Sequence, residues 1–204
     1  MQFITPVVRH LLIINVLFFI GTIWMGEDRY LLAAHYPTSE YFEPFQLVTY
    51  MFMHADIGHI FFNMFAVYMF GPPVEALWGE KKFLTYYFIT GFGALAAHFA
   101  VKYFEMQGMD PATAALATNV PILGASGSVF GLLLAFGMLF PEQRVMLLFP
   151  PIPMKARVMV ILYAALELVL GVGNMDSGVA HFAHLGGALT GFLMILYWQG
   201  FRLR

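Results

Sequence analysis

The stretch Ser-Gly-Ser-Val-Phe-Gly-Leu-Leu-Leu-Ala-Phe-Gly-Met-Leu-Phe, residues 126–140, is an uncharged apolar run that ends at Pro141. Because an α-helix rises about 1.5 Å per residue, these fifteen residues reach roughly 21 Å, whereas the hydrocarbon core of a bilayer is roughly 30 Å thick. If the inner end of the helix lies at the membrane surface, its outer end begins roughly 9 Å below the opposite surface. The sequence therefore predicts a short membrane helix with Ser126 at its submerged end.

The rest of the chain has the composition of an integral membrane protein. Of its 204 residues, 60% are hydrophobic and 11% are charged, and the mean hydropathy is +0.75. Soluble domains carry about 25% charged residues, so lipid must cover the apolar surface of this chain. We predict an all-α, polytopic fold: one membrane domain over residues 1–204, built as a bundle of six transmembrane helices with the short helix in fourth place. The predicted spans are residues 7–25, 57–77, 83–104, 126–140, 154–172 and 179–198.

Lysine and arginine are distributed unequally between the two sides of these spans. The outer side holds only Arg29, in a loop, and Lys102, at the outer end of the third span. The inner segments and inner span ends hold Arg9, Lys81, Lys82, Arg144, Lys155, Arg157, Arg202 and Arg204. The positive-inside rule then predicts that both termini are cytoplasmic, with the protein in the cell (inner) membrane. The first apolar run, residues 11–25, lacks a small-residue cleavage site, so we interpret it as a span and not as a signal peptide.

Two absences exclude whole classes of function. The chain contains no cysteine, which removes disulfides, thiolate metal sites and cysteine nucleophiles. The formal net charge is -2 and no basic run exceeds Lys81-Lys82, so the sequence offers no electrostatic footprint for nucleic acid. The expected partners are the lipid bilayer and the apolar segments of other membrane proteins.

Ser126 lies in the motif Gly124-Ala125-Ser126-Gly127, whose small residues let another backbone approach a hydroxyl at a helix start. Alone, this motif is also typical of helix capping and small-residue packing. His184 changes the interpretation, because residues 183, 187 and 191 form a small-residue stripe that brings a neighbouring helix close. If that neighbour is the helix that begins at Ser126, whose Gly127 and Gly131 repeat the same spacing, the imidazole can reach the serine hydroxyl and take its proton.

A third polar cluster surrounds the start of the second predicted span. His59 and Asn63 are four residues apart and share one helix face, while His54 lies just outside the span. By the same rise per residue, Asn63 lies roughly 9 Å and His184 roughly 8 Å below the outer surface, close to the depth of Ser126. Donors at that depth are suited to an oxyanion hole completed by the Ser126 backbone N–H. The alternative is a buried structural polar network.

Other ionisable residues lie in or near the spans. The zinc-protease pattern His-Glu-x-x-His is absent, so we expect no metal and no cofactor, although several histidines gather near the outer face: His54, His59, His98, His181 and His184. Carboxylates within membranes are functional suspects. For Glu167, and for Asp176 in the following loop, hydrogen-bonded or protonated structural roles are favoured, and a triad-like role for Asp176 is the weaker alternative.

The three motifs, Gly124-Ala125-Ser126-Gly127, Ala183-His184 followed by glycines, and His54-x4-His59-x3-Asn63, together resemble the rhomboid intramembrane proteases over about residues 44 to 192. The resemblance implies a six-helix fold with a Ser–His dyad. In that dyad Ser126 is the nucleophile and His184 the general base, while His59 and Asn63 assist the oxyanion.

Two positions depart from the pattern of that family. Phe45-Gln46 stands where Trp-Arg is frequent, and Phe130 stands where a tyrosine is frequent. Phe130 can still pack against the His184 ring, but it has no hydroxyl to donate. His54, Phe130 and Gly124 are therefore possible supporting residues.

The predicted function is that of a serine endopeptidase that cuts peptide bonds in or near transmembrane segments of other membrane proteins. Because a helix hides its carbonyls in hydrogen bonds, we expect a preference for substrate spans with Gly, Ala or Pro near the cut. Two alternatives belong to other classes. One is a membrane transporter lined by the buried polar residues, and the other is a protein that binds transmembrane segments without cutting them.

Overall fold

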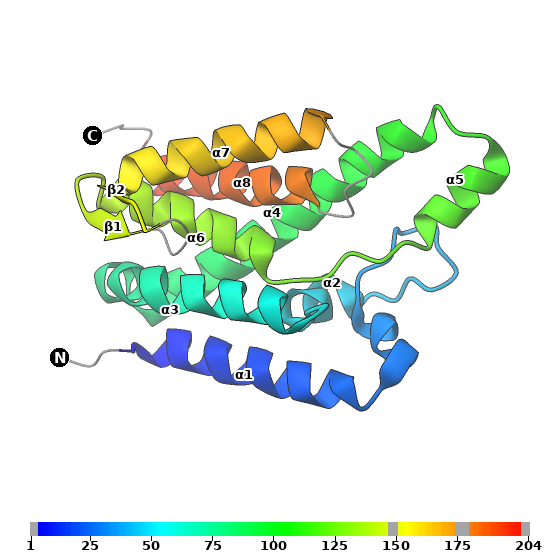
Figure 1. Ribbon diagram of the computed structural model, residues 1–204, viewed down its shortest axis with the longest axis horizontal. Coiled ribbons are helices and arrows are strands. Elements are labelled where there is room, and N and C mark those ends of the chain that lie inside the picture. Colours follow the sequence, from blue (N-terminus) through cyan, green and yellow to red (C-terminus); the bar gives the residue numbers. More distant parts are fainter. Residues whose placement is uncertain (1–3, 147–150, 174–179, 201–204) are drawn as a thin grey trace.

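The computed structural model describes residues 4–146, 151–173 and 180–200 and consists of packed helices with a small β-hairpin (Figure 1). The longer helices are α1 (Pro6–Ile23), α3 (Ile57–Trp78), α4 (Glu80–Met106), α6 (Ser126–Leu139), α7 (Ala156–Gly173) and α8 (His181–Trp198). The shorter elements are η1 (Gly26–Leu32), α2 (Gln46–Thr49), η2 (Tyr50–Phe52), α5 (Pro111–Thr118), β1 (Arg144–Met146) and β2 (Pro153–Lys155). Helix α1 begins and helix α8 ends at the same end of the bundle (Figure 1).

The outer surface of the bundle is apolar. Among the described residues, α1, α3, α4 and α7 are long and apolar enough to cross a membrane, while α6 is apolar but has only 14 residues. Large apolar side chains such as Leu17, Ile20 and Val169 are exposed on these helices. A surface of this kind is stable in lipid and not in water. The chain is therefore an integral membrane protein with a helical fold, as its composition predicted.

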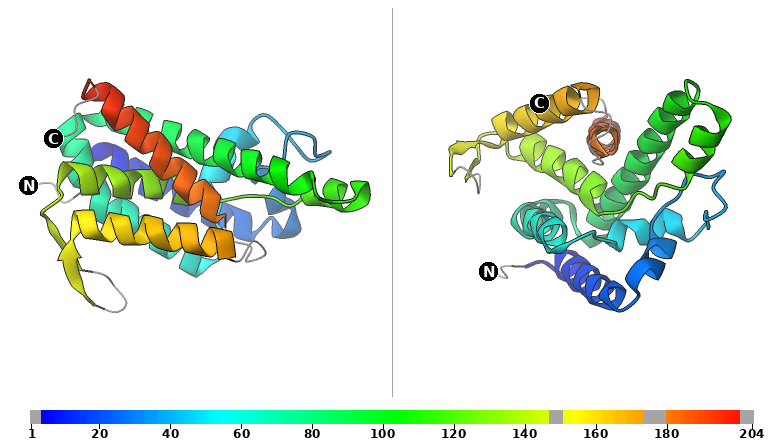
Figure 2. Two further views of the ribbon diagram at one scale, coloured as in Figure 1. Left: turned by 90° about the horizontal axis from the view of Figure 1, so that it is seen from above. Right: turned by 45° about the vertical axis from the view of Figure 1, so that its right-hand side comes forward.

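Helix α6 lies in the middle of the bundle. It packs against α3 on one side and against α4 and α8 on the other, and α8 is seen nearly end-on between α7 and α4 in Figure 2. Gly127 of α6 allows a close approach, because a Cβ atom at that position would lie 2.3 Å from Ala94 Cβ of α4. Close approach of backbones is the main source of helix association in lipid, where apolar burial contributes little.

Polar side chains of α4 and α6 bond to backbone carbonyls of the neighbouring helix. Tyr86 Oη donates to the Gly131 carbonyl at 2.8 Å, and Ser128 Oγ donates to the Tyr87 carbonyl at 2.7 Å. Both donors are buried. Because no water competes for these groups in the bundle interior, the two bonds help to fix α6 along α4.

A buried carboxylate on α3 holds the start of α1. Glu75 is 2% exposed and accepts hydrogen bonds from Val7 N at 3.0 Å, from Val8 N at 2.9 Å and from the Thr5 hydroxyl. These backbone N–H groups are among those that a helix N-terminus leaves unpaired. Glu75 therefore has a structural role.

Three segments differ from the predicted element pattern. Residues 105–125, predicted as a loop, contain α5, which Asp110 caps by accepting hydrogen bonds from Ala112 N and Thr113 N. The predicted loop 26–56 contains η1, α2 and η2. The fifth span was predicted to begin at Met154, but Met154 and Lys155 pair with β1, and α7 begins only at Ala156.

Candidate active site

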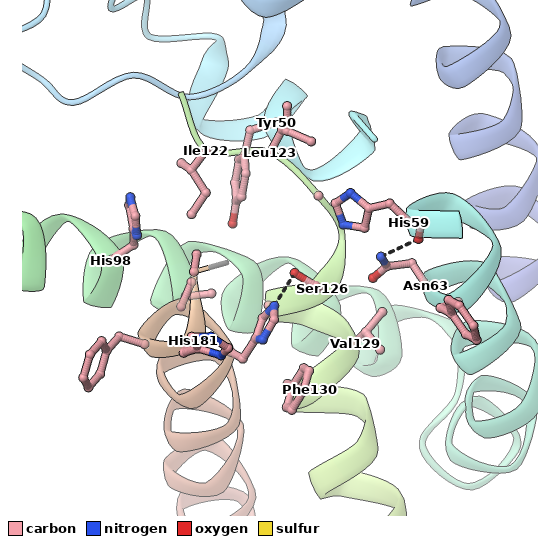
Figure 3. A pocket seen from close by; sticks show the side chains of 18 of the residues that line it. Tyr50, His59, Asn63, His98, Ile122, Leu123, Ser126, Val129, Phe130 and His181 are labelled. Carbon is pink, nitrogen blue, oxygen red and sulfur yellow. Dashed lines mark hydrogen bonds between the residues drawn. The ribbon is translucent and has the colours of Figure 1, made fainter. Parts of the chain in front are cut away.

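Ser126 and His184 meet at the same end of two adjacent helices. Ser126 is the first residue of α6, and His184 lies in the first turn of α8. Ser126 Oγ and His184 Nε2 are 2.8 Å apart, which is hydrogen-bonding distance, and Figure 3 draws this contact as a dashed line. Fifty-eight residues separate them in the sequence, so only the packing of α6 against α8 brings them together.

Glycines determine how closely these two helices approach. A Cβ atom on Gly187 would lie 2.0 Å from the Gly127 carbonyl oxygen and 2.8 Å from its carbonyl carbon. Gly187, in the middle of the predicted small-residue stripe, therefore does face α6. Gly191, one turn further along α8, faces α4 instead, because a Cβ there would meet Tyr86. Gly131 of α6 also faces α4, since its Cβ would meet Thr90.

The His184 ring is held from one side by an aromatic ring. Phe130, one turn along α6 from Ser126, stacks on His184 with ring centroids 4.4 Å apart and planes inclined by 4°. Phe130 also contacts Tyr163 of α7 edge-on, with centroids 6.4 Å apart. The packing expected of Phe130 is thus present without any contribution from a hydroxyl. It restricts the rotation of the imidazole without occupying the in-plane directions in which the two ring nitrogens form hydrogen bonds.

His59 and Gly124 lie beside Ser126. Gly124 has a φ of +125°. A Cβ atom built on it would lie 2.8 Å from His59 Nε2 and 3.7 Å from Ser126 Oγ, so the His59 ring and the Ser126 hydroxyl lie on either side of that position. His59 Nδ1 accepts a hydrogen bond from Ala55 N at 3.3 Å. In a neutral ring the proton then resides on Nε2, the nitrogen nearest Gly124. His59 is therefore oriented to donate toward the serine.

Asn63 lies one turn below His59 on the same face of α3 and is buried (Figure 3). Its Nδ2 donates to the His59 carbonyl at 2.8 Å. An amide group has a second N–H, which this bond leaves available. The first N–H groups of α6, including that of Ser126, have no carbonyl four residues earlier within the helix. Donors on α3 and at the start of α6 therefore line the cavity that contains the Ser126 hydroxyl.

His54 lies behind His59, not at the serine. The two rings contact edge-on with centroids 5.0 Å apart, and His54 is 2% exposed. Burial, aided by the neighbouring His59, lowers the pKa of His54 to about 4. His54 is therefore neutral at neutral pH. It contacts the His59 ring, and His59 in turn lies beside Ser126.

A single cavity of about 1020 Å³ contains these groups. Its lining includes His59 and Asn63 of α3, Ser126 of α6 and His184 of α8. His98 and Lys102 of α4 line another part of it, and Lys102 Nζ donates to the Val120 carbonyl at 3.2 Å. The predicted site residues thus share one space, and His98 lies in that space without a bond to Ser126 or His184 among the interactions of the described residues.

Residues 41–200 match the Rhomboid domain family. This match covers most of the chain and includes every residue of the site. The chain belongs to the rhomboid family.

Individual rhomboid relatives agree with this assignment. The chain is 32% identical to rhomboid protein 1, mitochondrial, of Saccharomyces cerevisiae over 83% of its own length and 45% of that protein. It is 29% identical to rhomboid protease AarA of Providencia stuartii over 71% of its length and 52% of that protein. It is 28% identical to rhomboid protease GluP of Bacillus subtilis over 74% of its length and 25% of that protein. The chain spans about half the length, or less, of these relatives.

Sequence reasoning did not connect Glu167 to the rhomboid site. Glu167 Oε2 lies 2.7 Å from His181 Nδ1 and 3.1 Å from His184 Nδ1. The carboxylate on α7 therefore lies next to the candidate base. The sequence did mark Glu167 as a carboxylate inside a predicted span. It did not indicate which neighbouring helix this side chain would face. Asp176, the other carboxylate that was considered, lies outside the described residues.

The same three residues have metal-ligand chemistry. Among the described residues, ligand atoms of Glu167, His181 and His184 all lie within 4.8 Å of one another. Two ligands on one tetrahedral zinc, at bond lengths of about 2.0–2.1 Å, are roughly 3.3 Å apart. The 2.7 Å between His181 and Glu167 is shorter and fits a hydrogen bond between imidazole and carboxylate.

For the protease activity proposed below, Gly124→Ala is expected to reduce the rate about 10²-fold. The added methyl displaces the His59 ring, and the loss of one oxyanion donor typically costs that much. Gly79→Ala is the matched control: Gly79 also has a positive φ, of +79°, but open space around its Cβ position. Both variants carry backbone strain, and only the first has the clash. Turnover of a reporter substrate per folded molecule measures the difference, and equal turnover would remove His59 from the site.

Proposed function

We propose that this rhomboid chain is an intramembrane serine endopeptidase that hydrolyses peptide bonds in or near the transmembrane segments of other membrane proteins. The observation that carries the proposal is the 2.8 Å contact between Ser126 Oγ and His184 Nε2 inside a cavity that also holds His59 and Asn63. A hydroxyl beside a general base, with donors around it, is the arrangement that acyl transfer requires. Two relatives bear the name rhomboid protease.

The proposed reaction has two halves. The Ser126 hydroxyl gives its proton to His184 Nε2 as Oγ attacks the substrate carbonyl carbon, and the resulting oxyanion is stabilised by the Ser126 N–H and by donors on His59 and Asn63. The C–N bond then breaks, and the imidazolium gives its proton to the departing amine. A water molecule, deprotonated by His184, hydrolyses the acyl-enzyme and restores the serine. Neither half needs a metal ion or another cofactor.

The cavity supports the supply of both water and substrate. Its volume of about 1020 Å³ far exceeds the roughly 30 Å³ that one liquid water molecule occupies. Its wall also includes Phe62 and Phe65 of α3 and Met159 and Tyr163 of α7, an apolar surface that suits a transmembrane segment. A substrate carbonyl can reach Ser126 only after its helix unwinds locally, which is the reason to expect Gly, Ala or Pro near the cut.

We also propose that α6 and α8 complete a set of six spans, with both termini on the cytoplasmic side of the cell (inner) membrane, as the lysine and arginine distribution predicts. Because the natural chain has no cysteine, a single introduced cysteine reports the side of the membrane unambiguously. Glu142→Cys, before the hairpin, is expected to react with an impermeant maleimide only from the cytoplasmic side, and Asp110→Cys, at the start of α5, only from the outer side. The opposite pattern would invert the topology.

The experiment that tests the proposed function uses the purified chain in proteoliposomes with a single-span reporter protein whose helix contains Gly and Pro. We expect two fragments that share a cut in or near the membrane segment. Binding of the reporter without fragments would favour a protein that only docks transmembrane segments. Flux of a solute with an intact reporter would favour a transporter.

A further inference from the structure

Glu167 is a carboxylate on a helix, α7, whose surface consists largely of exposed apolar side chains. Its neighbours Leu166, Leu168 and Val169 are exposed, whereas Glu167 itself is 9% exposed and faces α8. A buried carboxylate contributes little net stability, and an apolar side chain of similar size is often as good or better at such a position. Packing alone therefore does not account for a glutamate here.

Both close contacts of Glu167 use the same oxygen. Glu167 Oε2 is 2.7 Å from His181 Nδ1 and 3.1 Å from His184 Nδ1. Among the described residues, His184 Nδ1 has no well-aligned hydrogen-bond partner, so Glu167 is the group within reach of that buried nitrogen. Catalytic hydrogen bonds are often poorly aligned without substrate and tighten when it binds. The other nitrogen of the same ring, Nε2, contacts Ser126.

A glycine one turn further along α7 permits this arrangement. A Cβ atom on Gly171 would lie 3.1 Å from His181 Cβ and 3.3 Å from the Phe182 ring. The start of α8 therefore rests directly on α7, and the two histidines lie over Glu167. The rings of His181 and His184 lie edge-on to each other with centroids 6.5 Å apart, and Figure 3 labels His181.

We infer that Glu167 is a positioning residue that extends the Ser126–His184 pair to a Ser–His–Glu arrangement, with His181 holding the carboxylate in place. This inference rests on the proposed function. By accepting a hydrogen bond from His184 Nδ1–H, Glu167 keeps Nε2 unprotonated and directed at Ser126. When Nε2 takes the serine proton, the carboxylate faces the resulting imidazolium and stabilises it without taking a proton itself.

The position of Glu167 distinguishes this role from a contact with substrate. The cavity lining includes His181, His184 and Gly171 but not Glu167. A substrate segment in the cavity therefore touches the imidazole and not the carboxylate. A change at Glu167 must act through His184, so it should alter the rate of the chemical step and leave substrate binding nearly unchanged.

Glu167→Gln tests this inference, because it keeps the size of the side chain and removes its charge. We expect kcat for the reporter to fall at least about 10²-fold with KM changed less than about twofold. Glu75→Gln is the matched control: a second buried membrane glutamate whose partners are at the start of α1. It should lower thermal stability and leave kcat per folded molecule unchanged. Equal kcat values for Glu167→Gln and the wild type would overturn the inference.

A measurement on the unmutated protein covers the case in which Glu167→Gln does not fold. Nitrogen-15 NMR of labelled histidines, with His184 assigned by its loss in His184→Gln, reports which ring nitrogen carries the proton. We expect the proton on Nδ1, and a proton on Nε2 in the neutral ring would contradict the role of Glu167. If the wild-type chain neither cuts the reporter nor reacts with serine-directed probes, the proposed function fails; a wild type that cuts while Glu167→Gln cuts equally well removes only the positioning role.

Discussion

Ser126→Ala is expected to reduce reporter cleavage by about 10⁴-fold or more, to the background rate, because the hydroxyl forms the covalent bond and no neighbour can replace it. Ser128→Ala is the matched control, two residues further along the same helix. Ser128 is buried and its hydroxyl is bonded to the Tyr87 carbonyl on α4, away from His184. Loss of that bond costs about 1 kcal/mol of stability and leaves turnover per folded molecule unchanged.

The proposed pair also makes a prediction about additivity. His184→Ala alone, and Ser126→Ala with His184→Ala, should each reduce cleavage about as much as Ser126→Ala, because two residues that act as one unit lose their contribution together. Fragment formation on gels and thermal unfolding of each purified variant measure the two effects separately. Cleavage by Ser126→Ala at a rate close to that of Ser128→Ala would assign the nucleophile to another residue.

Gly187→Ala is expected to have the second largest effect, although its side chain carries no chemistry. Its new Cβ would lie 2.0 Å from the backbone oxygen of Gly127, and a backbone atom in a helix cannot rotate away as a side chain can. The helices α6 and α8 must then separate by an ångström or more, which moves His184 away from Ser126. A displacement of about 1 Å at reacting groups costs about 10²-fold in rate, and stability falls as well.

Gly21→Ala is the control for helix-interior glycine replacement, because no atom lies within 4 Å of the Cβ position of Gly21. Alanine raises intrinsic helix propensity by up to about 1 kcal/mol at either site. Only the steric effect therefore differs between the two variants. Measured kcat and thermal unfolding should separate them, and normal turnover by Gly187→Ala would show that the site tolerates a wider helix separation than the structure implies.

The pairing of Ser126 with His184 could be predicted because small residues mark the surface on which helices meet. Gly127 and Gly187 are in contact, and the spacing of the small residues identified that face in advance. The same spacing did not reveal which helix each residue would meet, since Gly191 and Gly131 pack against α4 and not against each other. A stripe of small residues identifies the face on which a helix packs. It does not identify which neighbouring helix packs against each part of that face.

The segments outside the membrane were harder to predict. Asp110 and Pro111 form an ordinary helix start, but α5 is only eight residues long, and hydropathy does not detect so short an element. Met154 and Lys155 belong to the hairpin of β1 and β2, although the prediction from sequence assigned them to the start of the next span. Whether a segment forms a strand depends on the strand that pairs with it. The hydropathy of a single segment carries no information about that partner.

Glu167 shows why a site can be larger than its motifs. Fourteen residues separate it from His181 and seventeen from His184, across the loop between α7 and α8. The rotation of α7 about its axis decides whether Glu167 faces lipid or His184, and the hydropathy of one helix does not say which neighbouring helix its more polar face meets. Three-dimensional packing was needed to place the carboxylate beside the imidazole.

Labelling of the intact protein in membranes with a fluorophosphonate, followed by mass spectrometry of the modified peptide, examines the pairing of Ser126 with His184 without a substrate. The account predicts one phosphonylated residue, Ser126, and loss of that adduct both in Ser126→Ala and in His184→Ala, while Ser128→Ala is labelled at the wild-type rate. An adduct on a different residue, or labelling of Ser126 that persists unchanged in His184→Ala, would contradict it.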